Sequence, residues 1–294
     1  VATGCPVSGI TRDEAGWAVD ARGCGARREH DAVVLATGGF MGDLDEARAR
    51  LGIAADVPLV RSAPARADGG GLALAAAAGA SVPARQPGVV YAHAVPDPRD
   101  PTAALMIVEQ PRDAVIVDRA GRRQRGLLGV RGEGGRALLS LPGGTAWLVG
   151  PASLGRFGAH PLSGPPVPLE AVARAHGHRA GDLAGMEAAL GVPAGALTGL
   201  AFAEGARPTP ERPLPPRGPF LAVPLRPTPS KSLGGLSVDP SGRVLDADGV
   251  PVPGLWAAGE LTGFGDPYGA APRDSTMVAG AVLTGRAAGT AVAR

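Results

Sequence analysis

Two short segments of the chain combine a strand-like apolar pattern with residues that could serve a large ligand. Residues 31–40 and 254–260 are apolar runs of strand length that stop at small residues. Runs of this kind are typical of buried parallel strands, and small residues at their ends let a ligand approach the backbone closely. Glu260 stands at one such strand end, where its carboxylate could accept hydrogen bonds from ribose or ribityl hydroxyls. The pattern favours a dinucleotide ligand.

The segment after the second run predicts a helix over residues 275–293. Asp274, Ser275 and Thr276 are of the types that cap helices, and apolar positions follow at Met277, Val278, Val282 and Leu283. A helix N-terminus offers unpaired backbone N–H groups and a positive dipole end, which would stabilise the negative charge of a reduced flavin near N1 and O2. The alternative from the pattern alone is two core strands and a packing helix that bind nothing.

These residues resemble a known family, the flavoprotein subunits related to fumarate reductase, succinate dehydrogenase and the 3-ketosteroid dehydrogenases. The resemblance rests on residues 36–40, 254–260 and 274–289, with weaker matches at 69–80, 117–123 and 233–239. It implies an α/β fold, namely a partial Rossmann-like FAD-binding domain with an inserted α+β cap domain. Residues 1–90 and 229–294 would form parts of the FAD-binding domain, and residues 91–228 would form the cap.

Within this scheme we expect strands near residues 4–10, 17–20 and 32–36, and helices near 43–51 and 71–78. In the cap, helical patterns cover residues 169–175, 181–190 and 194–202. Beyond the cap, residues 236–246 are typical of a hairpin about a Pro-Ser-Gly turn. The resemblance implies FAD as the cofactor. The residues that it implies for FAD binding are Val7, Ala36, Thr37, Gly38, Gly39, Gly259, Glu260, Ser275, Thr276 and Met277.

One expected feature is missing from the sequence. The family begins with a strand, a G-x-G-x-x-G turn and a helix that hold the FAD pyrophosphate, and nothing of the kind precedes Val1. We therefore expect the C-terminal portion of a longer flavoprotein. Residues 132–137 fit G-x-G-x-x-A, but a helix from there could run only to Pro142, and no acidic residue follows before Glu170 to take ribose hydroxyls. We interpret this match as accidental.

The resemblance also implies the chemistry, a hydride exchange between flavin N5 and an activated C=C or CH–CH bond of an enoate or dicarboxylate. Counting from the family's turn motif makes Arg131 the implied proton donor, although Leu127 and Gln124 replace the expected acidic and aromatic neighbours. His93, Lys231 and Arg273 would bind substrate carboxylates, with Lys231 in place of the family's histidine. Each of the four also has a plain alternative as a solvated side chain.

Three alternatives stay open from the sequence. In the 3-ketosteroid branch, tyrosines act as acid and base on an apolar substrate, and Tyr91 and Tyr268 are available for this role. A truncated chain could fold without binding FAD or doing redox work. A third possibility is a subunit that receives the missing N-terminal lobe from another polypeptide.

Composition and charge limit the classes of function that this chain could have. The 294 residues carry a net charge of +2, with acids and bases interspersed, which gives no electrostatic case for nucleic acid. The basic run at residues 122–125 is expected to be a solvated turn. Cys5 and Cys24 form neither a C-x-x-C pair nor a dense framework, which argues against a zinc site and against a disulfide scaffold. The sequence has no spacing typical of metal ligands. No apolar run is long enough to cross a bilayer. We expect a cytoplasmic protein whose partners are a small-molecule substrate and either an electron-transfer partner or the missing lobe.

Overall fold

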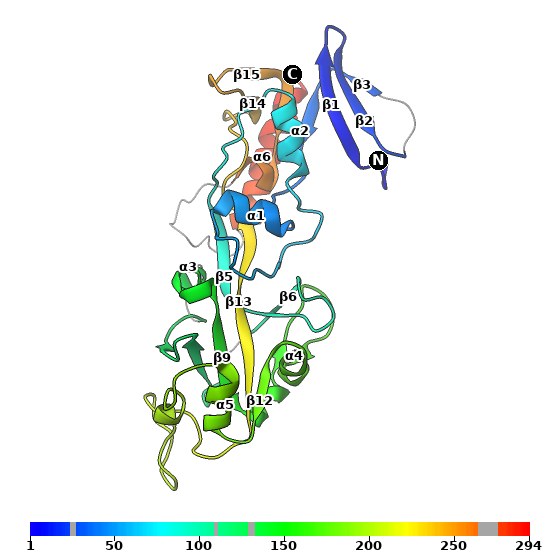
Figure 1. Cartoon of the computed structure of the whole chain (residues 1–294). Coiled ribbons are helices and arrows are strands. Elements are labelled where there is room, and N and C mark those ends of the chain that lie inside the picture. Colours follow the sequence, from blue (N-terminus) through cyan, green and yellow to red (C-terminus); the bar gives the residue numbers. More distant parts are fainter. Residues whose placement is uncertain (24–27, 109–110, 129–132, 264–275) are drawn as a thin grey trace. The chain divides into compact units, whose positions relative to one another are not determined.

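The computed structural model describes residues 1–23, 28–108, 111–128, 133–263 and 276–294, and the chain divides into two compact units (Figure 1). The first unit comprises Val1–Gly52, Ala63–Val89 and Lys231–Arg294, and the second comprises Ile53–Ser62 and Val90–Ser230. Both mix helices with sheets. Segments far apart in sequence therefore build the first unit.

In its described residues the first unit has an antiparallel sheet in the order β1-β2-β3 and a second sheet in the order β14-β15-β4. Strands β15 and β4 run parallel, whereas β14 is antiparallel to β15. The elements are β1 (Val7–Asp13), β2 (Gly16–Ala21), β3 (Arg28–His30), β4 (Val33–Leu35), α1 (Leu44–Leu51), α2 (Gly70–Ala77), β14 (Arg243–Leu245), β15 (Pro251–Ala257), the 3-10 helix η4 (Gly259–Thr262) and α6 (Thr276–Val292).

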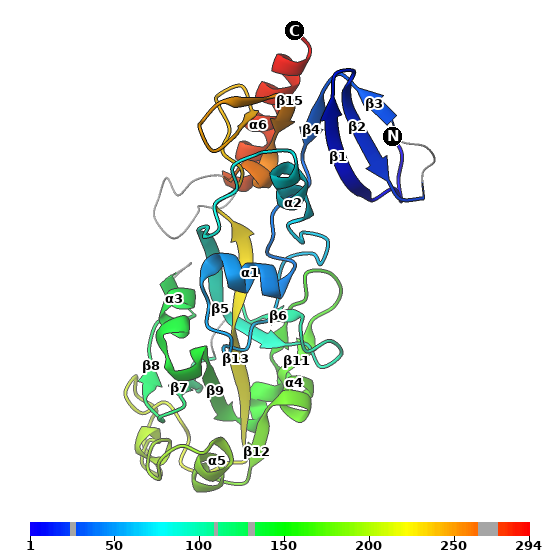
Figure 2. The same ribbon diagram turned by 45° about the horizontal axis from the view of Figure 1, so that its top comes forward.

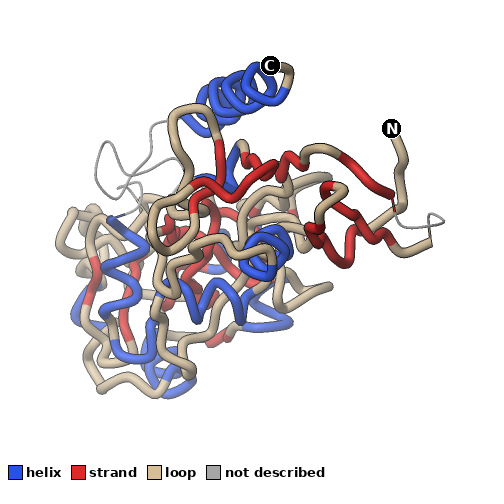
Figure 3. The backbone as a smooth tube through the Cα atoms, turned by 90° about the horizontal axis from the view of Figure 1, so that it is seen from above, coloured by secondary structure: helices blue, strands red, loops and turns tan. Residues whose placement is uncertain are grey.

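Local chemistry explains the first helix. The Asp43 carboxylate accepts hydrogen bonds from the N–H groups of Asp45 and Glu46 at 2.9 and 3.0 Å, and thus caps α1. Gly52 ends the helix with φ 71°, a conformation that favours glycine. The helix predicted over residues 43–51 is confirmed. The long C-terminal helix is also confirmed as α6, which ends near the C-terminus in Figure 3.

The core of the first unit joins its two sheets. Trp17 on β2 is 1% exposed, and its Nε1 donates to the carbonyl of Pro253 on β15 at 3.1 Å. Phe40, Leu72 and Leu255 belong to the same buried cluster. Because this cluster draws on residues 10–75 and 236–261, the first unit depends on both ends of the chain.

The sheet of the second unit has the order β6-β5-β13-β9-β7-β8, with β12 beside β13. Strand β5 begins in the first unit and β13 ends there. The elements are β5 (Gly88–Pro96), β6 (Ala104–Met106), β7 (Val115–Asp118), β8 (Arg123–Gln124), α3 (Glu133–Ser140), η1 (Pro142–Gly144), β9 (Ala146–Pro151), η2 (Ala152–Arg156), β10 (Gly158–Ala159), β11 (Val167–Pro168), α4 (Leu169–His176), β12 (His178–Ala180), α5 (Leu183–Leu190), η3 (Thr198–Leu200) and β13 (Phe220–Ser232).

Strand β13 is buried on both faces, and its successive side chains point to opposite faces of the sheet. Leu221, Val223 and Leu225 belong to one buried cluster, while Phe220 and Ala222 belong to another. Helix α4 contributes to the first cluster and α5 to the second. This sheet is therefore covered on two sides, which explains the continuous apolar run.

Three expectations from the sequence are wrong in detail. Residues 194–202 form only the short η3 and not an α-helix, because the Glu187 carboxylate accepts hydrogen bonds from three backbone N–H groups there. The basic run is not a free turn, since Arg123 and Gln124 form β8 against β7. Cys5 is disulfide-bonded, although the sequence indicated no disulfide scaffold.

Two smaller expectations are confirmed. Helix α3 ends at Ser140, before Pro142. Residues 236–246 form the expected hairpin, with a bridge between Val238 and Val244. Among the described helices, none combines the length and the apolar character that crossing a membrane requires.

Candidate cofactor site

Two parallel strands bring the predicted cofactor residues together. Leu255, Trp256 and Ala257 of β15 pair with Val33, Val34 and Leu35 of β4, in that order. The N–H of Ala258 then donates to the carbonyl of Leu35 at 2.9 Å. Because parallel strands end at the same edge of a sheet, the residues that follow them lie at one edge. These residues are Ala36, Thr37, Gly38, Gly39, Gly259 and Glu260.

A buried hydrogen-bond chain connects this edge to the end of β13. The Glu260 Oε1 accepts from the backbone N–H of Ser232 at 2.8 Å, and the Ser232 hydroxyl oxygen accepts from the N–H of Phe40 at 3.1 Å. Ser232 and Phe40 are both 0% exposed. Glu260 Oε2 receives no hydrogen bond from the described residues and belongs to a half-buried side chain. Glu260 thus anchors the edge with one oxygen and keeps the other as an acceptor.

Glycines at this edge have two different functions. A Cβ on Gly39 would overlap the Ser232 hydroxyl and would lie 2.7 Å from Glu260 Oε1, so Gly39 permits close internal packing. Gly38 and Gly259 have φ values of +84° and +74°, and among the described residues, their own chain neighbours aside, no heavy atom lies within 4 Å of a Cβ placed on either. Their backbones are therefore open to a ligand, and their conformation favours glycine.

Helices α2 and α6 contact the two segments that follow β4 and β15, one helix for each segment. A Cβ on Gly71 of α2 would overlap Thr37 Oγ1, so this glycine lets the helix approach the segment that follows β4. The N–H of Gly259 donates to Thr284 Oγ1 of α6 at 2.9 Å, and the Thr284 hydroxyl donates to the carbonyl of Gly280 at 2.8 Å. Figure 2 shows α6 beside β15 in the first unit.

Lys231 lies next to this edge through its neighbour Ser232. The segment that follows Ser232 is hydrogen-bonded to η4, because the N–H of Leu236 donates to the carbonyl of Leu261 at 2.8 Å. A Cβ on Gly235 would overlap that same carbonyl, which explains the glycine at this position. Lys231 itself is half-buried. The structure therefore places Lys231, one of the predicted catalytic residues, in the same unit as the edge formed by residues 36–39 and 259–260, which we call the cofactor edge.

The other predicted residues are distributed differently. His93 lies on β5 in the second unit, where its ring centroid is 5.0 Å from that of Tyr91. Burial lowers the pKa of His93 from its ordinary value and so favours the neutral imidazole. Val7 begins β1 and is 44% exposed. Thr276 and Met277 begin α6. Arg131, Tyr268, Arg273, Asp274 and Ser275 lie outside the described residues.

Two site residues escaped the sequence analysis, Ser232 and Thr284. Serine and threonine are common in every class of segment, and neither position has a spacing that distinguishes it. Ser232 does stand between Lys231 and the two glycines at 234 and 235, which is the only signal that could have pointed to it.

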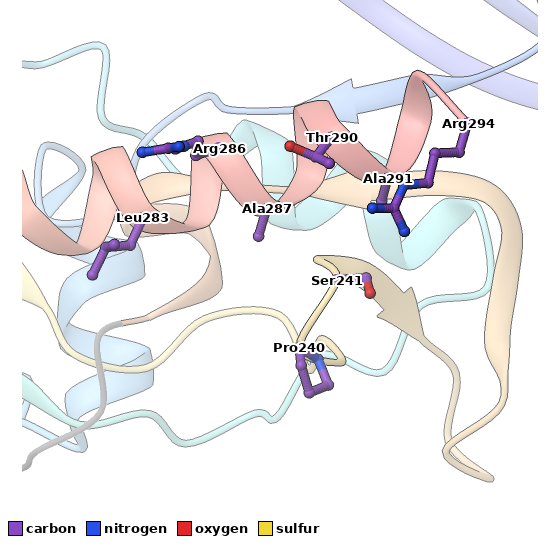
Figure 4. Close-up of a pocket in the computed structure, with 8 residues that line it drawn as sticks. All are labelled: Pro240, Ser241, Leu283, Arg286, Ala287, Thr290, Ala291 and Arg294. Carbon is purple, nitrogen blue, oxygen red and sulfur yellow. The ribbon is translucent and has the colours of Figure 1, made fainter.

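A separate pocket of about 440 Å³ lies between α6 and the turn at Pro240 and Ser241. Figure 4 shows Ala287 pointing from the helix toward the side of Pro240, with Arg294 near the end of the helix. This pocket contains none of the residues predicted for the cofactor or the substrate.

Comparisons with known proteins agree on a flavin-related family. Over 81 residues the chain is 44% identical to a KsdD-like steroid dehydrogenase of Mycobacterium tuberculosis, an alignment that covers 27% of this chain and 14% of the relative. Over 280 residues it is 26% identical to the fumarate reductase (cytochrome) of Shewanella frigidimarina, which covers 90% of this chain and 46% of the relative. The chain thus spans less than half the length of these relatives.

Solved structures show the same fold. The 3-ketosteroid delta1-dehydrogenase from Sterolibacterium denitrificans matches with a TM-score of 0.65 at 20% identity, over 98% of this chain and 59% of that one. A flavocytochrome c3 fumarate reductase in an open conformation matches with a TM-score of 0.63 at 21% identity, over 98% and 51%. The family model described as "FAD binding domain" matches residues 7–272. The chain therefore belongs to the FAD binding domain family, whose cofactor is FAD.

Proposed function

We propose that this chain is part of an FAD-dependent oxidoreductase that exchanges a hydride with an activated C=C or CH–CH bond. The observation that carries the proposal is the common edge at which β4 and β15 end, with Gly38, Gly259 and Glu260 in the segments that follow these strands. When bound, FAD supplies the hydride donor or acceptor at flavin N5. The names of the relatives, a steroid dehydrogenase and a fumarate reductase, support this reaction class.

The residues present fit the cofactor. Gly38 and Gly259 leave backbone open where a Cβ would otherwise stand. Within the described residues Glu260 Oε2 receives no hydrogen bond, and it can take one from a ribose or ribityl hydroxyl. Such a bond to a carboxylate is charge-assisted and roughly twice as strong as a neutral one. Glu260 would therefore orient the sugar or ribityl part of the cofactor while its other oxygen holds Ser232.

Part of the first unit's surface is apolar and uncovered. Val34 on β4 is 43% exposed, and on α6 Val278, Val282 and Leu283 are 68%, 62% and 68% exposed. Large exposed apolar side chains gathered on one element usually mark an interaction site. We propose that the dinucleotide-binding lobe expected from the family covers these residues and completes the site, either within the same polypeptide or as part of another.

For the substrate we propose an enoate or dicarboxylate bound in part by Lys231. A lysine ammonium binds a carboxylate as a point charge, and Lys231 adjoins the Ser232–Glu260 chain. Arg131 stays the proposed proton donor and Arg273 a proposed second carboxylate ligand, on the family resemblance alone. In this scheme the substrate carboxylate lies near the cofactor edge of the first unit.

A second substrate class is favoured by one observation. Burial lowers the pKa of His93, which favours its neutral form, and its ring lies beside that of Tyr91. A neutral imidazole attracts a carboxylate less than an imidazolium does, and a tyrosine hydroxyl can donate a proton to an enone oxygen. This pair suits an apolar ketone substrate, as the name of the steroid dehydrogenase relative suggests.

The first test is the visible absorption spectrum of the purified chain after incubation with FAD and gel filtration. Flavin that elutes with the protein supports the proposal, and Glu260→Gln should weaken its retention, whereas Glu29→Gln at an exposed residue of the same unit should not. A colourless protein would contradict FAD binding by this chain alone. In that case the rival interpretation, a folded chain without redox function, is tested by adding the dinucleotide-binding lobe of a relative.

The second test separates the two substrate classes in the flavin-loaded protein. If the substrate is an enoate or dicarboxylate, Lys231→Gln should raise KM for fumarate about tenfold, the loss of roughly one charge-assisted contact. Turnover of an androstenedione that is unaffected by Lys231→Gln but lost in Tyr91→Phe would instead support the apolar class.

A further inference from the structure

A second pocket, in the second unit, has strongly basic walls. Arg112, Arg123 and Arg125 line a cavity of about 640 Å³. Its other lining residues are Ala114, Thr209 and prolines, and no carboxylate of the described residues lines it. The pocket shares no residue with the cofactor edge or with the predicted substrate residues. It also includes two residues of the basic run that the proposed function does not use.

One of these arginines builds the pocket. Arg123 lies on β8, paired with Val117 of β7. Its Nη1 donates to the carbonyl of Pro210 at 2.6 Å and to that of Glu211 at 3.1 Å. Arg123 therefore fastens the loop that carries the opposite wall. Prolines at positions 208, 210 and 213 restrict the backbone of that loop, so the wall is stiff before any ligand arrives.

Within the described residues, the other two arginines have no partner of their own. In the described part of the chain, neither Arg112 nor Arg125 makes a hydrogen bond or an ion pair, and both are exposed. Burial, followed by the positive charge of Arg125, lowers the pKa of Arg123, although the charge of Glu211 acts in the opposite direction. Elsewhere in this unit arginines pair with carboxylates, as Arg61 does with Asp100 at 3.0 Å. The pocket thus concentrates positive charge that a bound anion would neutralise.

We propose that this pocket binds a multiply charged oxyanion, carrying either phosphoryl or carboxylate groups. Arg112 and Arg125 hold it with their guanidinium forks, whose geometry matches phosphate and carboxylate oxygens. Thr209 adds a donor, because its Oγ1 accepts from the N–H of Arg212 at 3.1 Å and its hydroxyl hydrogen can point to the ligand. No aromatic side chain lines the described walls, so recognition depends on charge and not on stacking.

Isothermal titration calorimetry of the purified chain at low salt tests the site, with pyrophosphate and citrate as probes. The informative variant is Arg112→Gln/Arg125→Gln, which leaves Arg123 and its loop intact. The matched control is Arg136→Gln/Arg156→Gln, two exposed arginines of the same unit that do not line the pocket. The variant should lose affinity about tenfold or more, and the control should keep it, with binding that weakens as salt rises.

Pyrophosphate binding tighter than citrate binding would identify a phosphoryl ligand, and the reverse order a polycarboxylate. The proposal is overturned if neither probe gives saturable binding, or if the pocket variant and the control lose affinity equally. A thermal melt of each variant checks that the fold is unchanged. Because no flavin takes part, this result is independent of the test of the oxidoreductase.

Discussion

Ser232 shows how one small buried side chain can hold distant segments together. Its hydroxyl oxygen accepts from the N–H of Phe40 at 3.1 Å and its own N–H donates to Glu260, so it connects three parts of the chain. A hydroxyl at a 0% exposed position has no water to replace these bonds. Ser232 is thus a positioning residue for the cofactor edge.

We expect Ser232→Ala to lower the free energy of unfolding by about 1–3 kcal/mol, because the buried N–H of Phe40 loses its acceptor. Urea denaturation followed by circular dichroism measures this. Ser230→Ala is the control, since this half-buried serine on the same strand has no side-chain hydrogen bond in the described residues. Equal losses in the two variants would mean that the hydroxyl of Ser232 does not act through Phe40.

His93 gives a prediction about pH. Burial lowers its pKa below the ordinary value of about 6.5, so below that pH the unfolded chain holds a proton that the folded chain does not. The free energy of unfolding should therefore fall as the pH drops from about 6.5 toward the lower folded pKa. Denaturation of the wild type and of His93→Gln across this range measures the difference. An identical pH dependence in both would contradict the assignment.

At the scale of elements, Glu187 at the end of α5 organises the loop that follows. Its Oε1 accepts from the N–H groups of Leu197 and Thr198 and from the Thr198 hydroxyl at 2.7 to 2.8 Å, and its Oε2 accepts from the N–H of Gly195 at 3.0 Å. Burial by itself would raise the pKa of Glu187, but these hydrogen bonds together lower it. The carboxylate takes the place of the helical hydrogen bonds that residues 194–202 would otherwise make.

Because the folded pKa is depressed, Glu187 stabilises the protein above its unfolded pKa of about 4.3, and this stability is lost as the pH falls through the folded value. Glu187→Gln should lower the free energy of unfolding by about 2 kcal/mol at pH 7. The reason is that the amide NH₂ of the glutamine, a donor, would face the N–H of Gly195, which is also a donor. The variant should also lose the wild type's extra sensitivity to acid. Glu204→Gln, at an exposed carboxylate in the same unit, should change stability by less than about 0.5 kcal/mol.

At the scale of the whole molecule, the proposed cofactor residues belong to one unit. Trp17 and Trp256 lie in that unit and Trp147 in the other, so tryptophan fluorescence can report on each unit separately. In Trp147→Phe, FAD at a hundredfold excess over its dissociation constant should raise the free energy of unfolding of the first unit by about 2.7 kcal/mol.

The companion variant Trp17→Phe/Trp256→Phe keeps Trp147 as the single tryptophan and reports on the second unit. Its transition should shift less with FAD, because the proposed contacts lie in the first unit. A shift confined to the second unit would contradict the assignment of the cofactor edge. The same pair of variants shows whether the two units unfold separately.

Much of the architecture could be predicted from local patterns. Apolar runs that end at small residues indicated β4 and β15, and a helix was expected near residues 43–51, where α1 lies, because such signals act over a few residues. The basic run was harder. The sequence showed its charge, but only the pairing of Arg123 with β7 and the loop carbonyls decided that it forms a strand and lines a pocket.

The sequence by itself determined the family and the cofactor class and predicted the segments of the candidate site, since motif order and residue type are local properties. The tertiary structure alone decided that Ser232 and Glu260 join residues 40, 232 and 260 in one hydrogen-bond chain. It also decided that Glu187 binds the backbone of a segment predicted as a helix and that burial lowers the pKa of His93. The physical reason is that burial and side-chain hydrogen-bond partners depend on how segments pack in three dimensions, which no local pattern contains.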